Sequence, residues 1–421
     1  MQLGCTSGNG ASDVGGSTQN GFRAGGPAPR LLVYSQDGLG LGHLRRTNTL
    51  ARRFLSACPD ACALLVSDSP LGTFFGMAPN QDYLKLPSIV KSRPGVWRGT
   101  SLPISGDDLL ALRQDLLTSA ALSFKPDLFV VDHMPHGALG ELLPTLEALR
   151  STDTRVVLGL RDIVDAPEIV RRRWQMEGAY EALESYYDLV LVYGNQDVYD
   201  VAVNYDMAPA VADRLHYCGY VCAPDEAQQT RRVRTRCLNG SKAERLIVAT
   251  AGGGADAYPL MEALLGAMPA ITAEAPTALT IITGPFMPED MRRALQVKAN
   301  GSGVKIRTSV QDVLSYIAAA DVVVGMAGYN TTVEVLRMAT PAVLVPRAGP
   351  SAEQRTRARL FDERRWVEMV EPEALSPDTL ATRVLAALDQ DRPAADHAPD
   401  LRGLDVAVNR LVSELGQPAV S

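Results

Sequence analysis

A histidine and an aspartate stand where a proton-abstracting pair is expected. His43 closes the glycine-rich segment SQDGLGLGH, and Asp132 ends the apolar run DLFVVD. His43 falls at the start of an expected helix, where the positive dipole end disfavours an imidazolium, so the ring is expected to accept a proton. An aspartate on its far nitrogen would orient it, as in hydroxyl-activating His–Asp pairs. The alternatives are a structural His43 and an Asp132 that caps a helix or contacts the following HMPHG segment.

A second set of polar residues interrupts the apolar pattern between 321 and 354. The run DVVVGM predicts a buried strand that breaks at Gly328 into a helix beginning with Tyr329, Asn330 and Thr331. The free N–H groups and dipole of such a helix tip bind phosphate. Glu334 follows in the opening turns, where a carboxylate suits neutral hydroxyls, such as a ribose diol, better than phosphate. Together these residues predict a nucleotide-sugar site.

Two glycine loops follow apolar runs. Gly252, Gly253 and Gly254 fit a cradle of backbone N–H groups around a diphosphate, although a tight turn would also explain them. The earlier loop, with Gly40 and Gly42, resembles the dinucleotide fingerprint only loosely because its third glycine is misplaced. Asp68 ends the next strand, where a ribose-binding acid would lie, so an NAD-dependent oxidoreductase stays open. The absence of G-x-x-x-x-G-K-[ST] argues against ATP-driven chemistry of that kind.

Composition narrows the classes of partner. The chain has 421 residues, is 46% hydrophobic and carries a net charge of −7, so nucleic acid is not expected to bind. No stretch of about 18 apolar residues predicts a membrane span. Six cysteines in so long a chain suggest free thiols in a reducing, cytoplasmic setting rather than disulfides or zinc. His133-x-x-His136 lacks further ligands, so we predict no metal and no cofactor.

Apolar runs and amphipathic stretches alternate along the chain, which predicts an α/β fold of two Rossmann-like domains facing across a cleft. The pattern stops between 221 and 242, where polar residues and arginines suggest a linker. Residues 88–104 are expected to form a long loop, and 70–105 offers apolar and aromatic side chains for a hydrophobic acceptor. The expected divisions are a glycine-rich tail (1–27), an N-terminal domain (28–222), a linker (223–243), a C-terminal domain (244–390), and a final linker and helix that packs back across the domains (391–421).

These motifs together resemble the GT-B glycosyltransferases. The similarity is greatest to family 28 and the transferases that form lipid II, and it is most specific in AGYNTTVEVL, PAVLVPR and the Glu-Gln pair at 353–354. The resemblance implies that the C-terminal domain binds the nucleotide sugar. It assigns the diphosphate to Gly252–Gly254 and Gly328–Thr331, and the ribose to Glu334. The nucleobase would lie near Val310, and the transferred sugar would contact Glu353 and Gln354.

The resemblance also implies that His43, oriented by Asp132, is the general base of a direct inverting displacement, with Gly40 and Gly42 on the acceptor side. The predicted function is therefore transfer of a sugar from an NDP-sugar, with UDP favoured, to a hydroxyl of a small-molecule or lipid-linked acceptor. Peripheral contact with the inner face of a membrane would suit a lipid-linked acceptor. The alternatives are a nucleotide-sugar epimerase or hydrolase, and a non-catalytic nucleotide-sugar binder.

Overall fold

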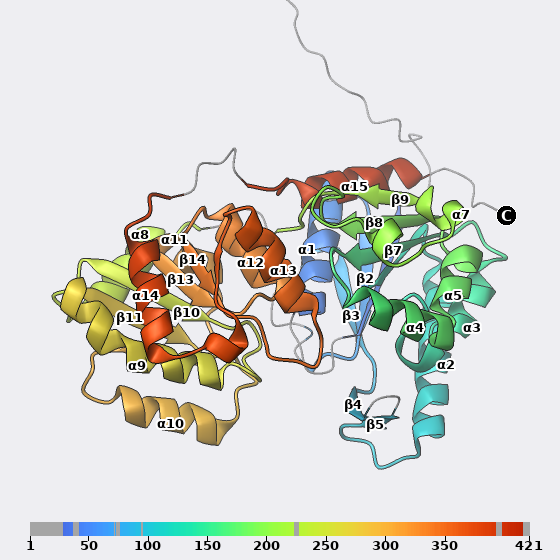
Figure 1. Cartoon of the computed structure of the whole chain (residues 1–421). Helices are drawn as coiled ribbons and strands as arrows, with labels where there is room; N and C mark the ends of the chain where they lie inside the picture. The colour runs from blue at the N-terminus through green and yellow to red at the C-terminus, as the bar shows by residue number, and fades with distance from the viewer. Residues whose placement is uncertain are drawn as a thin grey trace, which may run out of the picture.

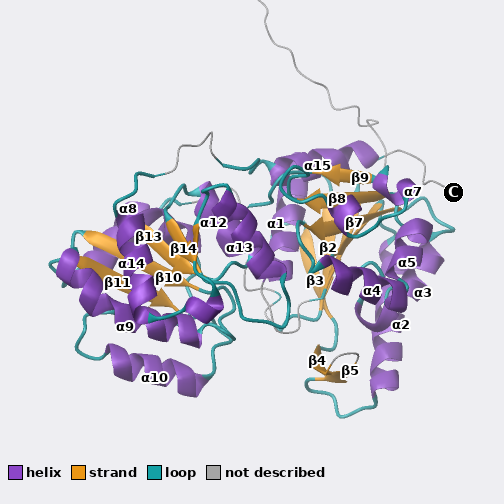
Figure 2. Cartoon of the chain, viewed as in Figure 1, coloured by secondary structure: helices purple, strands orange, loops and turns teal. Residues whose placement is uncertain are grey.

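The computed structural model describes residues 28–36, 42–70, 72, 76–93, 96–222, 227–392 and 398–415. Gly40 and the expected tail over 1–27 lie outside the described residues. Each half of the described chain is built around one parallel sheet with helices on both faces (Figures 1 and 2).

The N-terminal sheet has seven parallel strands in the order β3-β2-β1-β6-β7-β8-β9. Every residue of its inner strands β6 and β8 is buried, as expected where helices cover both faces of a parallel sheet. The strands are β1 (Arg30–Ser35), β2 (Cys62–Ser67), β3 (Gln81–Lys85), β6 (Leu128–Asp132), β7 (Arg155–Arg161), β8 (Leu189–Tyr193) and β9 (Leu215–Tyr217). The helices of this domain are α1 (Gly42–Ala57), α2 (Gly106–Phe124), η1 (Ala138–Gly140), α3 (Leu143–Leu149), α4 (Pro167–Glu177), α5 (Ala179–Tyr186), α6 (Val201–Asn204), α7 (Pro209–Ala212) and, from the end of the chain, α15 (Gly403–Glu414).

The C-terminal sheet has six parallel strands in the order β12-β11-β10-β13-β14-β15. The strands are β10 (Arg245–Thr250), β11 (Thr277–Ile282), β12 (Lys305–Arg307), β13 (Val322–Gly325), β14 (Ala342–Leu344) and β15 (Glu368–Met369). The helices are α8 (Thr230–Leu238), α9 (Tyr258–Glu274), α10 (Glu289–Ala299), α11 (Val313–Ala319), α12 (Tyr329–Arg337), α13 (Glu353–Glu363), η2 (Pro372–Ala374) and α14 (Pro377–Leu388). The helix α8 lies within the segment expected to be a linker and packs against α11.

In both sheets the order in which successive strands are added reverses beside the first strand. Each such point creates a crevice at the edge of the sheet. In the N-terminal sheet the reversal lies between β1 and β6, and in the C-terminal sheet it lies between β10 and β13. Ligands of open parallel sheets bind outside the carboxyl ends of the strands at such a point. His43 follows β1, and Asp132 ends β6. The glycine loop follows β10, and α12 follows β13. The topology alone therefore brings these groups to two facing crevices.

The chain crosses between the domains twice, once before α8 and once before α15. On the N-terminal domain the two passages are paired, because Tyr220 N donates to Asp400 O (2.7 Å) and Gly403 N donates to Tyr220 O (3.2 Å). The contact is so close that a Cβ on Gly403 would lie 2.4 Å from Gly219 O. Helix α15 then packs on α1, where Arg53 forms an ion pair with Asp405 (2.7 Å).

The expectation of a loop over 88–104 was wrong. Residues 89–99 form an antiparallel pair, β4 (Ile89–Arg93) and β5 (Val96–Gly99), separate from both large sheets. The pair packs on α2 through Leu109, Ile89 and Trp97, which explains how so polar a segment acquires regular structure. The prolines of this segment favoured the loop, and neither IVKSR nor VWRG shows the alternation that would have predicted a strand.

Candidate active site

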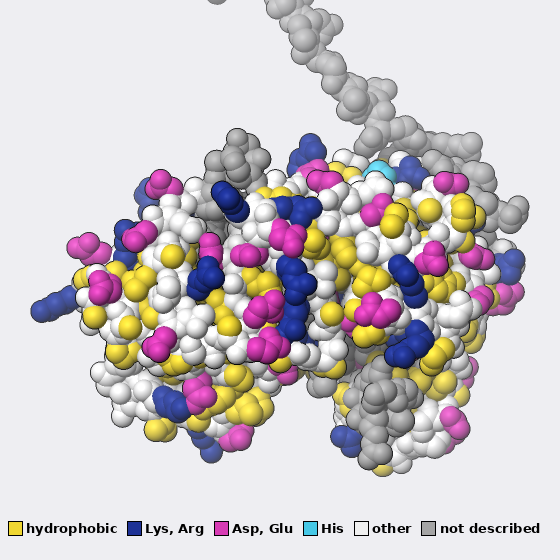
Figure 3. Space-filling view, viewed as in Figure 1, with side chains coloured by type: hydrophobic (Ala, Val, Ile, Leu, Met, Phe, Trp, Pro, Cys, Tyr) yellow, Lys and Arg dark blue, Asp and Glu magenta, His cyan; other side chains and the backbone are white. Residues whose placement is uncertain are grey.

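A cavity of about 360 Å³ lies between the two domains. Its walls come from the start of α1 on one side and from the loops after β10, β12, β13 and β14 on the other. In the space-filling view the surface is notched between the domains, and acidic and basic side chains are interspersed over the visible face (Figure 3). The cavity is therefore a shared crevice, with each domain contributing one wall.

His43 lines this cavity and is hydrogen-bonded to Asp132. The distance from His43 Nδ1 to Asp132 Oδ2 is 2.5 Å, and the side chains are 22% and 1% exposed. Burial alone would raise the pKa of Asp132, but Arg46 and His43 outweigh it and hold that pKa below its ordinary value. Asp132 is thus a carboxylate that accepts the Nδ1 proton, which leaves the lone pair of His43 on Nε2.

The glycines of the loop after β10 serve two different purposes. Gly254 has a φ of +89°, and a Cβ there would lie 1.9 Å from Thr283 O, so its lack of a side chain serves the packing of the loop on β11. Gly252 has a φ of +57°, and a Cβ there would meet only Thr331 Oγ1, at 4.0 Å. Gly252 and Gly253 line the cavity opposite the tip of α12, so they are the part of the loop that a diphosphate could approach.

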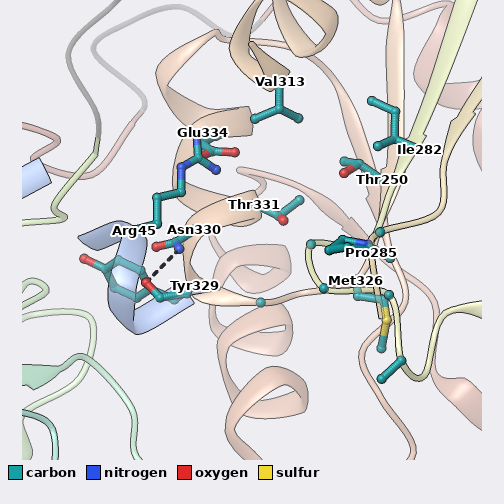
Figure 4. A pocket seen from close by; sticks show the side chains of 18 of the residues that line it. Arg45, Thr250, Ile282, Pro285, Val313, Met326, Tyr329, Asn330, Thr331 and Glu334 are labelled. Atoms are coloured by element: carbon teal, nitrogen blue, oxygen red, sulfur yellow. Dashed lines mark hydrogen bonds and ion pairs between the residues drawn. The ribbon is translucent and has the colours of Figure 1, made fainter. Parts of the chain in front are cut away.

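The tip of α12 faces both domains. Asn330 Nδ2 donates to Gly42 O across the cleft (3.2 Å), and Thr331 lines the cavity beneath it (Figure 4). Tyr329 is buried, and its hydroxyl accepts from Val221 N (2.8 Å). Gly328 precedes the helix with open space where a Cβ would lie, its nearest neighbour being Gln354 Nε2 at 3.9 Å. Gly328, Asn330 and Thr331 line the cavity, so the N-terminal end of α12 faces it.

Glu334, expected to hold a ribose, is paired with an arginine from the opposite domain. Arg45 Nη1 lies 2.5 Å from Glu334 Oε1, and the glutamate side chain is 6% exposed (Figure 4). Burial raises the pKa of Glu334, and Arg45 offsets only part of that effect. A ribose could reach the carboxylate only if the Arg45 side chain moved aside.

Glu353 is also tied to the opposite domain. It pairs with Arg161 from β7 (2.9 Å) and with Arg357 from its own helix (3.0 Å). Burial would raise the pKa of Glu353, but the two arginines outweigh it and keep that pKa low. The side chain of Gln354 accepts from Arg347 N (3.1 Å), which fixes the loop after β14 against α13.

The structure thus gathers most of the residues singled out from the sequence around one cavity. Its lining includes Gly42, His43, Gly252, Gly253, Gly254, Val310, Gly328, Tyr329, Asn330, Thr331, Glu334, Glu353 and Gln354. Asp132 lies behind His43, and Gly40 lies outside the described residues.

Sequence reasoning missed the arginines of the cleft. Arg46 lies one helical turn after His43, a spacing that places both on one face of α1 and could have indicated it. Arg161 ends β7 as Asp132 ends β6, which is the same positional signal. His133 Nε2 accepts from Arg161 Nη2 (3.1 Å), and burial holds the pKa of His133 well below its ordinary value. His133 is therefore a neutral support for Arg161.

The comparisons with known proteins bear on this C-terminal domain first. Residues 247–406 match the model of the glycosyltransferase family 28 C-terminal domain. This domain belongs to glycosyltransferase family 28. A curated relative from Granulibacter bethesdensis, a UDP-N-acetylglucosamine–N-acetylmuramyl-(pentapeptide) pyrophosphoryl-undecaprenol N-acetylglucosamine transferase, is 32% identical over 109 residues. That match covers 25% of this chain and 28% of the relative, so the chain spans less than a third of the relative's length.

Similarity to solved structures extends over nearly the whole chain. Phytolacca americana UGT2, solved with UDP-2fluoro-glucose and pterostilbene, aligns with a TM-score of 0.61 at 11% identity, covering 93% of this chain and 100% of that one. The UDP-GlcNAc 2-epimerase from Methanocaldococcus jannaschii aligns with a TM-score of 0.61 at 10% identity, covering 91% and 99%. At these identities the likeness establishes the fold: the chain has the GT-B arrangement of two Rossmann-like domains.

Within the described ranges no group of three or more His, Cys, Asp or Glu side chains is placed to hold a metal ion. In that same part of the chain, no helix combines the length and apolar character that crossing a bilayer requires.

Proposed function

We propose that this chain is an inverting glycosyltransferase that moves a sugar from a nucleoside diphosphate, with UDP as the nucleotide, to an acceptor hydroxyl. The observation that carries the proposal is that His43 and the N-terminal end of α12 line the same cavity from different domains. A base on one wall and a phosphate-binding helix tip on the other match the two ends of a displacement at an anomeric carbon.

In the proposed reaction, His43 Nε2 takes the proton of the acceptor hydroxyl while the oxygen of that hydroxyl attacks the anomeric carbon of the donor sugar. The bond from that carbon to the diphosphate breaks, and its electron pair leaves with the phosphate oxygen. Backbone N–H groups at Gly252, Gly253 and the start of α12 would stabilise the leaving group through preorganised dipoles. The proposal assigns this role to the backbone, without a metal or other cofactor.

The donor would lie along the C-terminal wall. The ribose diol would replace Arg45 as the partner of Glu334. The nucleobase would lie beside Val310, and the transferred sugar would contact Glu353 and Gln354. The family 28 match over this domain supports UDP as the nucleotide, because the curated relatives use UDP-N-acetylglucosamine.

The acceptor would enter from the N-terminal wall beside His43. The relative from Granulibacter bethesdensis acts, by its name, on a pyrophosphoryl-undecaprenol acceptor. By that relation we propose a lipid-linked or small hydrophobic acceptor, and a cytoplasmic enzyme in peripheral contact with the inner face of the membrane.

Isothermal titration of the purified chain with UDP tests the donor site. We expect binding, and we expect Glu334→Ala to raise the Kd for UDP about 10-fold or more, because hydrogen bonds to a charged group contribute about 1.5–3 kcal/mol. A UDP affinity that is unchanged in the variant, with the circular dichroism spectrum preserved, would show that Glu334 does not bind the ribose.

A nucleotide-sugar epimerase is the second candidate, because an epimerase of known structure shares the whole fold. Incubation with UDP-N-acetylglucosamine alone separates the two. An epimerase changes the sugar without an acceptor, whereas a transferase leaves the donor intact apart from slow hydrolysis.

A further inference from the structure

Arg46 contacts both carboxylate oxygens of Asp132, the residue that is hydrogen-bonded to His43. Its Nη2 lies 2.8 Å from both oxygens of Asp132, and its Nε lies 3.1 Å from Oδ1. The same Nη2 is 3.2 Å from His43 Nδ1. Three side chains from α1 and β6 thus share one compact charge cluster.

The guanidinium of Arg46 lies close to two aromatic rings. Its carbon lies 5.5 Å from the ring centre of Tyr193, at the end of β8, and 5.4 Å from that of Tyr329, at the start of α12. The Arg46 side chain is only 3% exposed. A planar fork between two aromatic rings has few alternative orientations, so Asp132 is held in one position.

This arrangement determines which nitrogen of His43 carries the proton. Arg46 Nη2 can only donate, and an ionised Asp132 can only accept. The close approach of Nη2 to Nδ1 is therefore not a hydrogen bond when Nδ1 carries the proton that Asp132 accepts. The alternative, in which Nδ1 accepts from Arg46, would require a protonated Asp132. The low pKa of that carboxyl excludes this alternative at neutral pH.

We propose that Arg46 is the positioning residue of the His43–Asp132 pair: it fixes Asp132 as an oriented carboxylate, keeps the proton on His43 Nδ1, and places a cation beside the imidazole ring. The inference rests on the proposed function for the role of Nε2 as a base. The arrangement of the three side chains can be measured without any substrate.

Other charged groups also face the histidine. The ring of His133 lies 5.2 Å from that of His43, centre to centre, and burial keeps it neutral. Arg161, which contacts His133, forms an ion pair with Glu353, and Arg45 forms another with Glu334. Tyr193 and Tyr329 stay protonated, because burial raises the pKa of both. Each charged neighbour outside the cluster is balanced by its own partner, which leaves Arg46 as the cation acting directly on the His43–Asp132 pair.

Nitrogen-15 NMR of histidine-labelled protein tests the proposal in the free enzyme. The chain has only five histidines, and His43→Gln identifies the His43 signals by their loss. In the wild type we expect the neutral ring to carry its proton on Nδ1, with a sharp, strongly deshielded Nδ1 proton. A neutral ring protonated on Nε2 would overturn the proposal directly, before any Arg46 variant is made.

The variants separate charge from geometry. Arg46→Met removes a cation from beside the imidazole and leaves Asp132 less neutralised, and both effects favour protonation. We expect the His43 titration midpoint to move to higher pH by about one unit or more. Arg46→Lys keeps the charge but loses the fork, so we expect a midpoint near that of the wild type and a broadened Nδ1 proton signal.

Arg52→Met is the matched control, because Arg52 is exposed on the same helix about 9 Å further along, and it should change neither signal. An unchanged or lowered midpoint in Arg46→Met would overturn the proposal. If that variant does not fold, an Nδ1 signal as sharp in Arg46→Lys as in the wild type overturns it instead. Since no substrate is present, failure of the glycosyltransferase assignment would appear in UDP binding and turnover rather than in these spectra.

Discussion

At the scale of single residues, Glu334 is an acid whose burial opposes stability. Its pKa is raised in the folded chain, so the group contributes stability that is present below its unfolded pKa and lost as the pH rises through the folded pKa. Arg45 is 24% exposed and can reach water if its partner is removed. The acid is retained at a stability cost, which is what a binding role would require.

We therefore expect Glu334→Gln to raise the Tm at pH 8, because the amide needs no charge to be buried. The difference should shrink as the pH approaches about 4.3, the ordinary pKa of glutamate, where the wild-type carboxyl becomes neutral in both states. Thermal melts across that pH range measure the effect. Glu184→Gln, a change at an exposed position, should leave the Tm nearly constant, and equal melting of wild type and Glu334→Gln at pH 8 would contradict the argument.

His43 can be tested by separating turnover from binding. We expect His43→Ala to lower kcat about 10²-fold or more, the scale of a lost general base, while the Kd for UDP stays near that of the wild type. Steady-state kinetics with donor and acceptor, alongside calorimetry with UDP, give the two readings. Turnover close to that of the wild type would assign the proton transfer to another group.

The sequence could identify His43 and Asp132, because each follows a recognisable apolar run and both runs end at the same sheet edge. It could not identify the ion pairs Arg45–Glu334 and Arg161–Glu353. Those depend on how two separate domains meet, and no periodicity in either half encodes that contact.

At the scale of elements, the loop after β10 shows how one glycine run serves two purposes. The sequence Gly252–Gly254 predicted a phosphate cradle, yet Gly254 is explained by its contact with Thr283 on the neighbouring strand. The strand predicted from DVVVGM is β13, because its apolar run is continuous and ends before the polar start of a helix. The pair β4–β5 was missed because its short strands do not alternate apolar and polar residues and a proline lies between them.

Two alanine substitutions distinguish the roles within this loop. In Gly254→Ala the Cβ would clash with Thr283 O at a φ of +89°, so we expect the free energy of unfolding to fall by about 3 kcal/mol or more. In Gly252→Ala there is space for the Cβ, and the φ of +57° should cost only about 1–2 kcal/mol. Urea denaturation gives the stabilities and calorimetry gives the UDP affinities. We expect Gly252→Ala to lose more binding than stability, and equal stability losses in the two variants would contradict the assignment.

At the scale of the whole molecule, one buried ion pair joins the domains. Arg357 of α13 binds both oxygens of Asp162, which follows β7, at 2.8 and 2.6 Å. The two side chains are 0% and 1% exposed, and Arg357 also donates to Ala327 O. Removing one partner of such a pair leaves an uncompensated buried charge, at a cost of about 3–5 kcal/mol.

We expect Arg357→Met to lower the Tm and to increase the radius of gyration, because it removes the only charge that compensates Asp162 within this contact. Calorimetry and small-angle X-ray scattering measure the two quantities. Arg359→Met lies on the same helix at an exposed position and should change neither. A variant that melts and scatters like the wild type would show that the domains are held together by other contacts.

The paired passages at Tyr220 and Asp400 have a mechanical consequence. The two passages are hydrogen-bonded to each other on the N-terminal domain, so both connections to the C-terminal domain start from one place. Any widening of the crevice would then be a rotation about the Tyr220–Asp400 contact, with the largest displacement on the side of the crevice furthest from it. Such a rotation would separate Arg45 from Glu334 and Arg161 from Glu353. A ligand that binds any of these four side chains would therefore change how easily the crevice opens.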